Sequence, residues 1–461
     1  MSKTRIEKDS FGELEIPAEA YYGVHTVRSV RNFGAAGEPV PLEMIYGMAK
    51  MKLACAKANH HLGLLDDKKT NAIVAACERV LKGEFDDQFP IDCFHAGSGT
   101  SSNMNVNEVI ANIANEILGG KRGDRGLVHP NDDVNKGQST NNIFPSAIRV
   151  ANVDLAKGTL KALHQLIAAL EAKAVEFSDV IKSGRTHLQD AVPVTLGQEF
   201  AAWAHALKKA VGRIERAREQ ILEVGEGGNA IGTGVNTKKE FRPLIAKYLA
   251  EFTGDAYRPA GNGIEITQFL TDKAEMSSAL RLAAMDIGKI CNDLRLMCSG
   301  PNTGFAEIVL PPVEPGSSIM PGKINPSIAE ATNMAMIQII GNDAAVQAAC
   351  AAGQLELNTH MPVTGLNLVK SQRILARAAI GLAEKCIAGI KANRERCYTY
   401  FETSGGLATI LNPKLGYDKV SALVKESLAT KKTARQIVVE KGLLTGEEFD
   451  ELVKGSTGPN L

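Results

Sequence analysis

Apolar residues recur at helical spacing along most of this chain, and polar stretches rich in glycine and proline separate the helical segments. The pattern predicts helices at about 44–60, 67–82 and 103–118, and then five long ones. The long helices are expected at about 146–177, 196–224, 267–297, 327–354 and 366–394. Helices well beyond the average of about 11–12 residues are typical of a helical bundle. We therefore predict an all-α fold.

Changes in pattern along the chain suggest three domains. Residues 1–142 are expected to form an N-terminal domain, residues 143–396 a central helical bundle, and residues 397–461 a small C-terminal helical domain. Long bundle helices often have faces too apolar for a monomer. We expect the chain to form an oligomer through these helices.

Composition narrows the classes of partner. Hydrophobic residues make up 44% of the chain and aromatic residues only 5%, which favours close-packed helices over strands. The 52 basic residues balance the 52 acidic ones, so neither nucleic acid nor an anionic membrane is expected as a partner. A local pocket, rather than the overall charge, must hold any anionic substrate.

Cysteine usage and the N-terminus indicate a compartment. The eight cysteines are scattered and include no Cys-x-x-Cys pair, so we expect free thiols in a reducing cytoplasm. The first residues lack the apolar segment of a secretory signal, and no run of eighteen apolar residues predicts a membrane span. We expect a cytoplasmic protein.

The stretch from Gly316 to Pro326 holds the most suggestive chemistry, with two hydroxyls, a lysine and an amide in eleven residues. A serine is a poor base at its ordinary pKa, so its alkoxide needs a cation or backbone N–H groups nearby. Lys323 and the backbone of residues 317–322 could supply both. A linker between helices has a similar composition, so this stretch alone decides nothing.

Three further polar stretches also lie between predicted helices. Gly97–Asn103 and Gln138–Asn141 each precede a helix, and each offers more donors than one N-cap requires. We expect Ser102 or Asn103 to cap the first of these helices and the remaining donors to suit a carboxylate. The third stretch, Gly184–Asp190, contains His187. A lone histidine is more often structural, and Arg185 could simply pair with Asp190 or a neighbouring helix.

Two other kinds of site find little support. Gly225–Ala230 formally matches a dinucleotide-binding pattern, but it follows a helix rather than a strand. The nine histidines show no metal-ligand spacing, so no metal site is expected.

Together these segments resemble the fumarase/aspartase superfamily. Gly316–Asn325 is similar to its signature loop, Gly97–Asn103 to its first conserved block and Gly184–Asp190 to its second. The resemblance extends from about Arg5 to Leu452. It implies a three-domain fold, a homotetramer with a core of twenty long helices, active sites each built from three subunits, and no cofactor for the core chemistry.

The resemblance also implies a mechanism and residue roles. A base removes a proton beside a carboxylate, an aci-carboxylate dianion forms, and a leaving group departs to give fumarate. Ser317 would be the base, and His187 would contact the substrate and pair with Glu330. Lys323 and Asn325 would hold a substrate carboxylate. The other substrate-binding residues would be Ser318, Ser98, Thr100, Ser101, Ser139, Thr140, Asn141 and Thr186.

Within the superfamily the features favour an aspartate ammonia-lyase, which converts L-aspartate reversibly to fumarate and ammonia. They are Ala20–Gly23, Ser101, Ser139–Asn141, Thr186–Asp190, residues 290–296 and Asn333. Ser98 and His129–Asp132, similar to a second dicarboxylate site, favour a class II fumarate hydratase instead.

Two departures from the family pattern leave a related amino acid open as substrate. Asn142 stands where the family usually has Asp, and Met361 stands where an acidic or basic residue usually precedes the proline. A catalytically silent structural protein is a third alternative, and the intact Ser317, Lys323, Asn325 and His187 argue against it.

Overall fold

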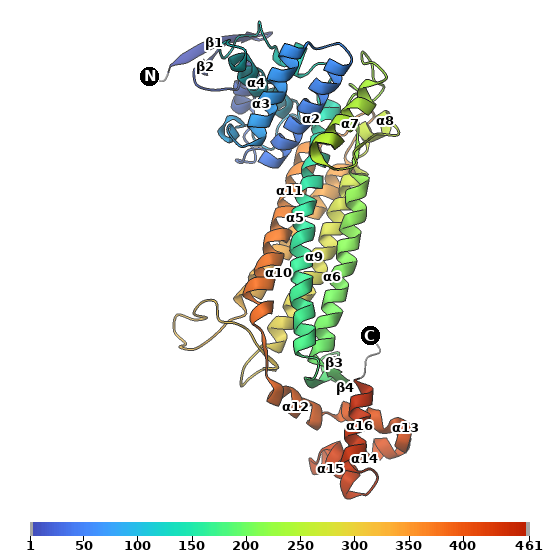
Figure 1. The fold of residues 1–461 in the computed structure, drawn as a ribbon. Helices are drawn as coiled ribbons and strands as arrows, with labels where there is room; N and C mark the ends of the chain where they lie inside the picture. The colour runs from blue at the N-terminus through green and yellow to red at the C-terminus, as the bar shows by residue number, and fades with distance from the viewer. Residues whose placement is uncertain (1–2, 458–461) are drawn as a thin grey trace. The chain divides into compact units, whose positions relative to one another are not determined.

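The computed structural model describes residues 3–457, and helices dominate it, which confirms the all-α prediction (Figure 1). Within these residues, strands occur in four two-stranded sheets. Three pairs are antiparallel and one is parallel. The antiparallel pairs are β1 (Thr4–Asp9) with β2 (Gly12–Pro17), β3 (Ile181–Thr186) with β4 (Gln189–Thr195), and β7 (Ile308–Val309) with β8 (Lys391–Ala392); the parallel pair is β5 (Glu223–Val224) with β6 (Arg258–Pro259).

The five long helices predicted from periodicity are present. They are α5 (Thr140–Glu176), α6 (Leu196–Gln220), α9 (Thr271–Met297), α10 (Ser327–Ala351) and α11 (Met361–Lys385). The shorter α-helices are α1 (Val24–Asn32), α2 (Leu42–His61), α3 (Asp67–Leu81), α4 (Thr100–Ile117), α7 (Phe241–Thr253), α8 (Gly263–Gln268), α12 (Arg394–Thr403), α13 (Asn412–Leu415), α14 (Tyr417–Thr430), α15 (Ala434–Glu440) and α16 (Gly446–Ser456). Short turns of 3₁₀ or π helix lie at Asp86–Gln88, Pro130–Val134, Ile387–Gly389 and Gly405–Leu411.

Several helices begin earlier than the sequence pattern predicts, among them α11, which begins at Met361 instead of residue 366. Helix α4 begins at Thr100 instead of residue 103, and α5 begins at Thr140 instead of after Pro145. Pro145 removes the one backbone donor that would reach the Asn141 oxygen, and the helix continues through it with its other bonds. As a result, Thr100, Ser101, Thr140 and Asn141 all lie on first turns of helices.

Side chains mark several helix ends in the way their sequences suggest. Asp66 accepts a hydrogen bond from the backbone nitrogen of Lys69 and starts α3. Helices α15 and α16 each begin with a capping box, Thr433 with Gln436 and Thr445 with Glu448.

The chain divides into two compact units. The first unit comprises Met1–Leu160, Gly212–Leu282 and Gln338–Leu375, and the second comprises Lys161–Val211, Ala283–Ile337 and Ala376–Leu461. Each of the five long helices contributes one segment to each unit. The division into three domains stays a prediction, and residues 458–461 of the expected C-terminal domain lie outside the described residues.

The first unit contains α1–α4, α7 and α8 with the adjoining parts of the long helices. Polar side chains join α5 to α11 inside it. The buried amide nitrogen of Gln372 donates to the backbone and side-chain oxygens of Asn152, 3.0 and 2.8 Å away, and its oxygen accepts from Thr159. Buried amides that satisfy each other in this way fix the register of two packed helices.

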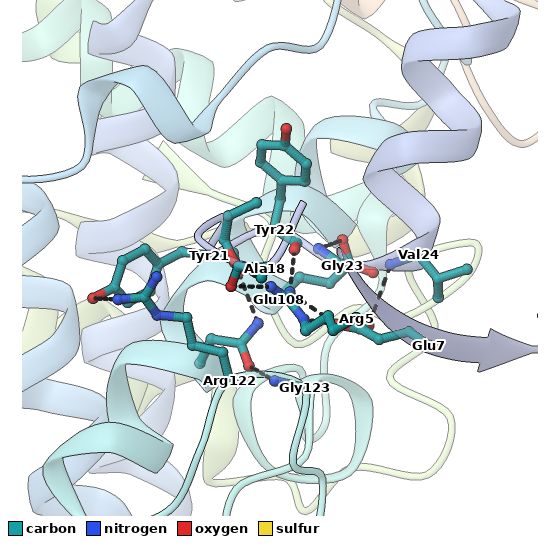
Figure 2. A network of polar contacts seen from close by, with 12 residues as sticks. Arg5, Glu7, Ala18, Tyr21, Tyr22, Gly23, Val24, Glu108, Arg122 and Gly123 are labelled. Atoms are coloured by element: carbon teal, nitrogen blue, oxygen red, sulfur yellow. Dashed lines mark hydrogen bonds and ion pairs between the residues drawn. The ribbon is translucent and has the colours of Figure 1, made fainter. Parts of the chain in front are cut away.

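Arg5 and Glu108 hold the segment that leads from the N-terminal hairpin into α1 (Figure 2). The Arg5 guanidinium donates to the backbone oxygens of Pro17, Ala18, Ala20 and Tyr22, 2.7–3.1 Å away. Glu108, on α4, accepts hydrogen bonds from the backbone nitrogens of residues 23, 25 and 26 and thereby caps α1. The Tyr21–Tyr22–Gly23 stretch therefore has a structural role, because its backbone binds Arg5 and Glu108 of α4.

The second unit contains the β3–β4 hairpin and helices α12–α16. Its C-terminal part has a hydrophobic core of its own, built around Phe401, Leu411, Ile437 and Phe449. Across residues 3–457, no helix combines the length and the apolar character needed to cross a membrane.

Candidate active site

The first donor-rich stretch lies at the N-terminus of α4, in the first unit. Gly99 is the N-cap residue of this helix, and it has no side chain that could cap it. The expectation that Ser102 or Asn103 caps α4 is therefore wrong. The hydroxyls of Ser98 and Thr100 lie 3.0 Å apart and half-buried, close to backbone N–H groups of the helix start. Such a helix end with spare donors is suited to bind an anion.

Two glycines allow the α4 N-terminus to pack closely on its surroundings. Gly99 has a φ of 91°, and a Cβ at this position would lie 2.1 Å from the ring of Phe144 on α5. A Cβ on Gly97 would lie 2.1 Å from the backbone oxygen of Thr359. Thr359 lies just before α11, whose first residue is Met361. The start of α11 thus borders the first donor-rich stretch.

His95 supports this helix end, and sequence reasoning missed it. Its Nδ1 lies 3.1 Å from the backbone oxygen of Ala96, which can only accept, so Nδ1 carries the proton. Its Nε2 therefore accepts from the hydroxyl of Ser102 at 2.7 Å. Burial lowers the pKa of His95 to about 4, so the ring is neutral at physiological pH.

The second donor-rich stretch lies at the N-terminus of α5 and contacts the first. The Ser139 hydroxyl accepts from the backbone nitrogen of Asn141 at 3.3 Å and so takes the capping role. The side-chain nitrogen of Asn103, on α4, donates to the Thr140 hydroxyl oxygen at 3.0 Å. The side-chain nitrogen of Asn141 donates to the backbone oxygen of Ala230 at 2.8 Å. The first unit thus brings both predicted stretches together.

A cavity of about 560 Å³ opens beside the α4 N-terminus. Thr100, Ser101, Arg28, Arg125 and Asn131 are among the residues that line it. Carboxylates partly neutralise both arginines, since Arg28 binds Asp9 at 2.8 Å and Arg125 lies 3.6 Å from Glu7. Hydroxyls, backbone donors and arginines together suit a small anionic ligand.

The third polar stretch, in the second unit, is a β-hairpin. Its tip residues His187 and Leu188 both have positive φ, 53° and 58°, as a tight two-residue turn requires. Thr186 and His187 are exposed. The side chains at the base of the hairpin are anchored, because Arg185 and Lys182 each bind the fully buried Glu307 at 2.7 Å. Arg185 is thus structural, and Thr186 and His187 remain available.

The Ser317 stretch, also in the second unit, places backbone donors on its serine. The Ser317 hydroxyl oxygen accepts from the backbone nitrogens of Ile319 and Met320, 3.2 and 3.1 Å away. The loop is closed by Gly316, whose nitrogen donates to the Lys323 oxygen and whose oxygen accepts from the Asn325 amide. The Ser318 and Lys323 side chains are exposed.

No hydrogen bond among residues 3–457 joins the Ser317 loop to Thr186 or His187, or His187 to Glu330. The pairing of His187 with Glu330 and the substrate roles of these residues stay predictions.

Comparison with known proteins identifies the family. Residues 12–341 match the family described as Lyase, and residues 407–456 match Fumarase C C-terminus. Aspartate ammonia-lyase from Escherichia coli K12 is 46% identical over 97% of this chain and 94% of its own length. The chain belongs to the fumarase/aspartase superfamily of lyases.

Other members are similarly close. Class II fumarate hydratase from Halobacterium salinarum is 48% identical over 97% of this chain and 96% of its own. The crystal structure of a "fumarate lyase:delta crystallin" from Brucella melitensis bound to cobalt aligns with a TM-score of 0.94 and 44% identity, over 98% of this chain and 99% of that one. Both C–N lyases and hydro-lyases of the superfamily thus resemble the chain to a similar degree.

The two departures from the superfamily pattern lie in the interior. Asn142 is 1% exposed, and its amide nitrogen donates to the hydroxyl of Thr267 at 2.9 Å. Met361 is fully buried at the start of α11. Within the described residues, no group of three or more His, Cys, Asp or Glu side chains is placed to hold a metal ion.

Proposed function

We propose that this lyase is an aspartate ammonia-lyase, which converts L-aspartate reversibly to fumarate and ammonia. The observation that carries the choice of an amine substrate is the orientation of Asn141. The backbone oxygen of Ala230 can only accept, so the Asn141 nitrogen must face it. This orientation leaves the side-chain oxygen of Asn141 on the other side as an acceptor, which complements the donor-only ammonium group of aspartate.

In the proposed reaction, the hydroxyls of Thr100, Ser101, Ser139 and Thr140 and the Lys323 ammonium bind the two substrate carboxylates. The Ser317 alkoxide removes a proton from C3, and the electron pair of that C–H bond moves into the adjacent carboxylate to give the aci-carboxylate dianion. The pair then forms the C2–C3 double bond while the C2–N bond breaks and ammonia leaves. Hydrogen bonds from preorganised donors supply the largest stabilisation of such a dianion.

The two backbone donors on Ser317 support its role as the base. A hydroxyl that accepts two N–H hydrogen bonds is stabilised as an alkoxide, because such bonds strengthen when the acceptor becomes charged. Glycine at position 316 lets this turn close on Lys323 and Asn325.

We also propose that the active protein is a homotetramer in which several chains complete each site. Helix α10 exposes large apolar side chains, since Met334 and Ile337 expose 65% and 63% of their surface. Exposed apolar side chains on one long helix mark a face that another chain covers. All eight cysteines are free thiols, which fits the proposed cytoplasmic location.

A class II fumarate hydratase is the second candidate. The observation in its favour is the His129–Asp132 segment, where Asn131 lines the same cavity as Thr100. In that case water rather than ammonia would leave.

The substrate is decided by offering L-aspartate and L-malate separately and following fumarate by its ultraviolet absorbance. We expect fumarate from aspartate. Activity on malate alone would overturn the aspartase assignment in favour of the hydratase, and activity on neither would support a structural protein or another amino acid as substrate.

A further inference from the structure

A buried lysine lies behind the N-terminus of α5. Lys52, on α2, is fully buried, and its ammonium donates to the side-chain oxygens of Asn135 and Gln138, both 2.8 Å away. Burial lowers the pKa of Lys52 to about 8, and burial also raises the pKa of the nearby Glu226 side chain to about 8. Glu226 is itself 1% exposed and belongs to the glycine-rich Gly225–Ala230 stretch. The lysine is therefore charged at neutral pH.

Because an ammonium group can only donate, Lys52 fixes which way Asn135 faces. The Asn135 oxygen must point to the lysine, and its nitrogen then donates to the backbone oxygen of Gln138 at 3.2 Å. The same Asn135 oxygen also accepts from the side-chain nitrogen of Asn103 at 3.2 Å. The orientation of Asn135 thereby sets that of Asn103.

The orientation of Asn103 in turn sets the role of Thr140. The Asn103 nitrogen donates to the Thr140 hydroxyl oxygen at 3.0 Å, so this hydroxyl acts as an acceptor towards Asn103. Its own proton is left free to point elsewhere. A half-buried hydroxyl with a free proton can donate to a carboxylate, whereas one that donates to Asn103 cannot.

An unfavourable feature shows that this orientation is imposed. The side-chain oxygen of Asn103 is buried and lacks a hydrogen-bond partner among the described residues. A flipped Asn103 amide would satisfy that oxygen with the Thr140 proton. The flip would also bring the Asn103 oxygen against the Asn135 oxygen, because Lys52 holds the Asn135 oxygen in place. An unsatisfied buried acceptor is costly, so it persists here because the alternative is worse.

We propose that Lys52 is a positioning residue that sets the direction of the hydrogen bond between Asn103 and Thr140, and so keeps the Thr140 proton available for a substrate carboxylate. The inference rests on the proposed function, in which Thr140 binds the substrate. It deepens that function by explaining how the α5 donors are oriented.

A double-mutant cycle on fumarate binding tests the proposal, since fumarate is common to both candidate reactions. Calorimetry on the whole protein would compare wild type, Lys52→Met, Thr140→Val and the double variant. Each single variant is expected to bind fumarate about tenfold more weakly, the usual loss for a hydrogen bond to a charged group. The double variant should bind about as weakly as Thr140→Val alone, because the lysine acts through the hydroxyl that is already absent.

The controls separate positioning from general damage. Lys50→Met removes a neighbouring lysine on α2 that pairs with Asp154, and it should bind fumarate like the wild type. Additive losses in the cycle, or unchanged binding by Lys52→Met, would overturn the proposal. If Lys52→Met does not fold, Asn103→Leu removes the same donor to Thr140, and additivity with Thr140→Val would again overturn it. Wild-type protein that binds no fumarate would instead overturn the proposed function.

Discussion

The hydroxyl oxygen of Ser317 accepts a hydrogen bond from the backbone nitrogen of Met320, 3.1 Å away. Together with the Ile319 nitrogen at 3.2 Å, this contact places two donors on the atom that carries negative charge in the proposed mechanism.

Replacement of Ser317 by alanine should therefore lower kcat by on the order of 10²–10⁴-fold, the usual contribution of a positioned base. The side chain is only half-buried, so the fold and the oligomer should be unaffected. Fumarate formation measures the first effect and size-exclusion chromatography the second. Near-normal kcat in a correctly assembled variant would exclude Ser317 as the base.

A substitution at Gly99 should disturb the α4 N-terminus. In Gly99→Ala the new Cβ would collide with the Phe144 ring, and the residue would also keep an unfavourable positive φ. We expect a loss of about 1–3 kcal/mol, typical of an overpacked core, seen as a lower Tm, together with weaker fumarate binding.

Gly63→Ala is the matched control for that prediction. Gly63 also has a positive φ, 70°, but a Cβ there would meet nothing within 4 Å. The Gly63→Ala variant should lose only the smaller part of the free energy of unfolding that comes from a non-glycine residue at positive φ. Equal losses in the two variants would mean that contact with Phe144 contributes nothing.

His95 should make stability depend on pH. Its pKa is lowered to about 4 from an ordinary 6.5, so the unfolded chain binds the proton more readily between these values. The stability from the neutral ring is therefore complete above about pH 6.5 and is lost as pH falls towards 4, by up to ~3 kcal/mol.

The variant His95→Phe isolates this effect, because it keeps an aromatic ring but cannot titrate. It should have a lower Tm than the wild type at about pH 7.5, since the Ser102 hydroxyl loses its acceptor, and the difference should shrink at about pH 4.5. Titrations shared by the two proteins cancel in the comparison. A Tm difference that is constant with pH would contradict the prediction.

The exposed apolar face of α10 predicts how the oligomer can be broken. Ile337→Glu would place a charge in an apolar contact between chains, which costs several kcal/mol when no partner compensates it. We expect dissociation to smaller species in analytical ultracentrifugation and loss of activity. Leu428→Glu, at a leucine on α14 that is 77% exposed against 63% for Ile337, should leave the assembly intact. A tetramer that survives Ile337→Glu would exclude this face from the interface.

Periodicity predicted that the five long helices exist, because each has enough apolar repeats to outweigh local exceptions. It placed the last of them at 366–394, whereas α11 extends from Met361 to Lys385. It failed at the starts of α4 and α5, where the first turns consist of Thr, Ser and Asn and, in α5, are followed by Pro145. Such residues are also typical of loops, and tertiary contacts such as that of Gly99 with Phe144 decide between the two. The sequence pattern indicates a break between two helices at Thr186–Gln189, but it does not predict the β-hairpin that the structure has there.

The candidate site was predictable where its residues form short motifs, as in residues 97–103 and 316–325. The residues that orient the site, such as Lys52, His95 and Asn135, were not predictable, because they are scattered along the chain. A lysine is normally expected to be exposed to solvent. The spacing of Lys52 from Met48 and Cys55 nevertheless places it on a buried stripe of α2. The donor relationship between Asn103 and Thr140 requires coordinates.

The first unit is assembled from three separate stretches of chain, and the last of them ends at Leu375. During synthesis, residues 1–160 emerge from the ribosome long before the α10 and α11 segments that complete their packing. The nascent protein must therefore hold apolar helices without their partners until most of it has been translated. Such a chain depends on protection from aggregation while it is made, and a truncation before Leu375 leaves an incomplete unit rather than a smaller enzyme.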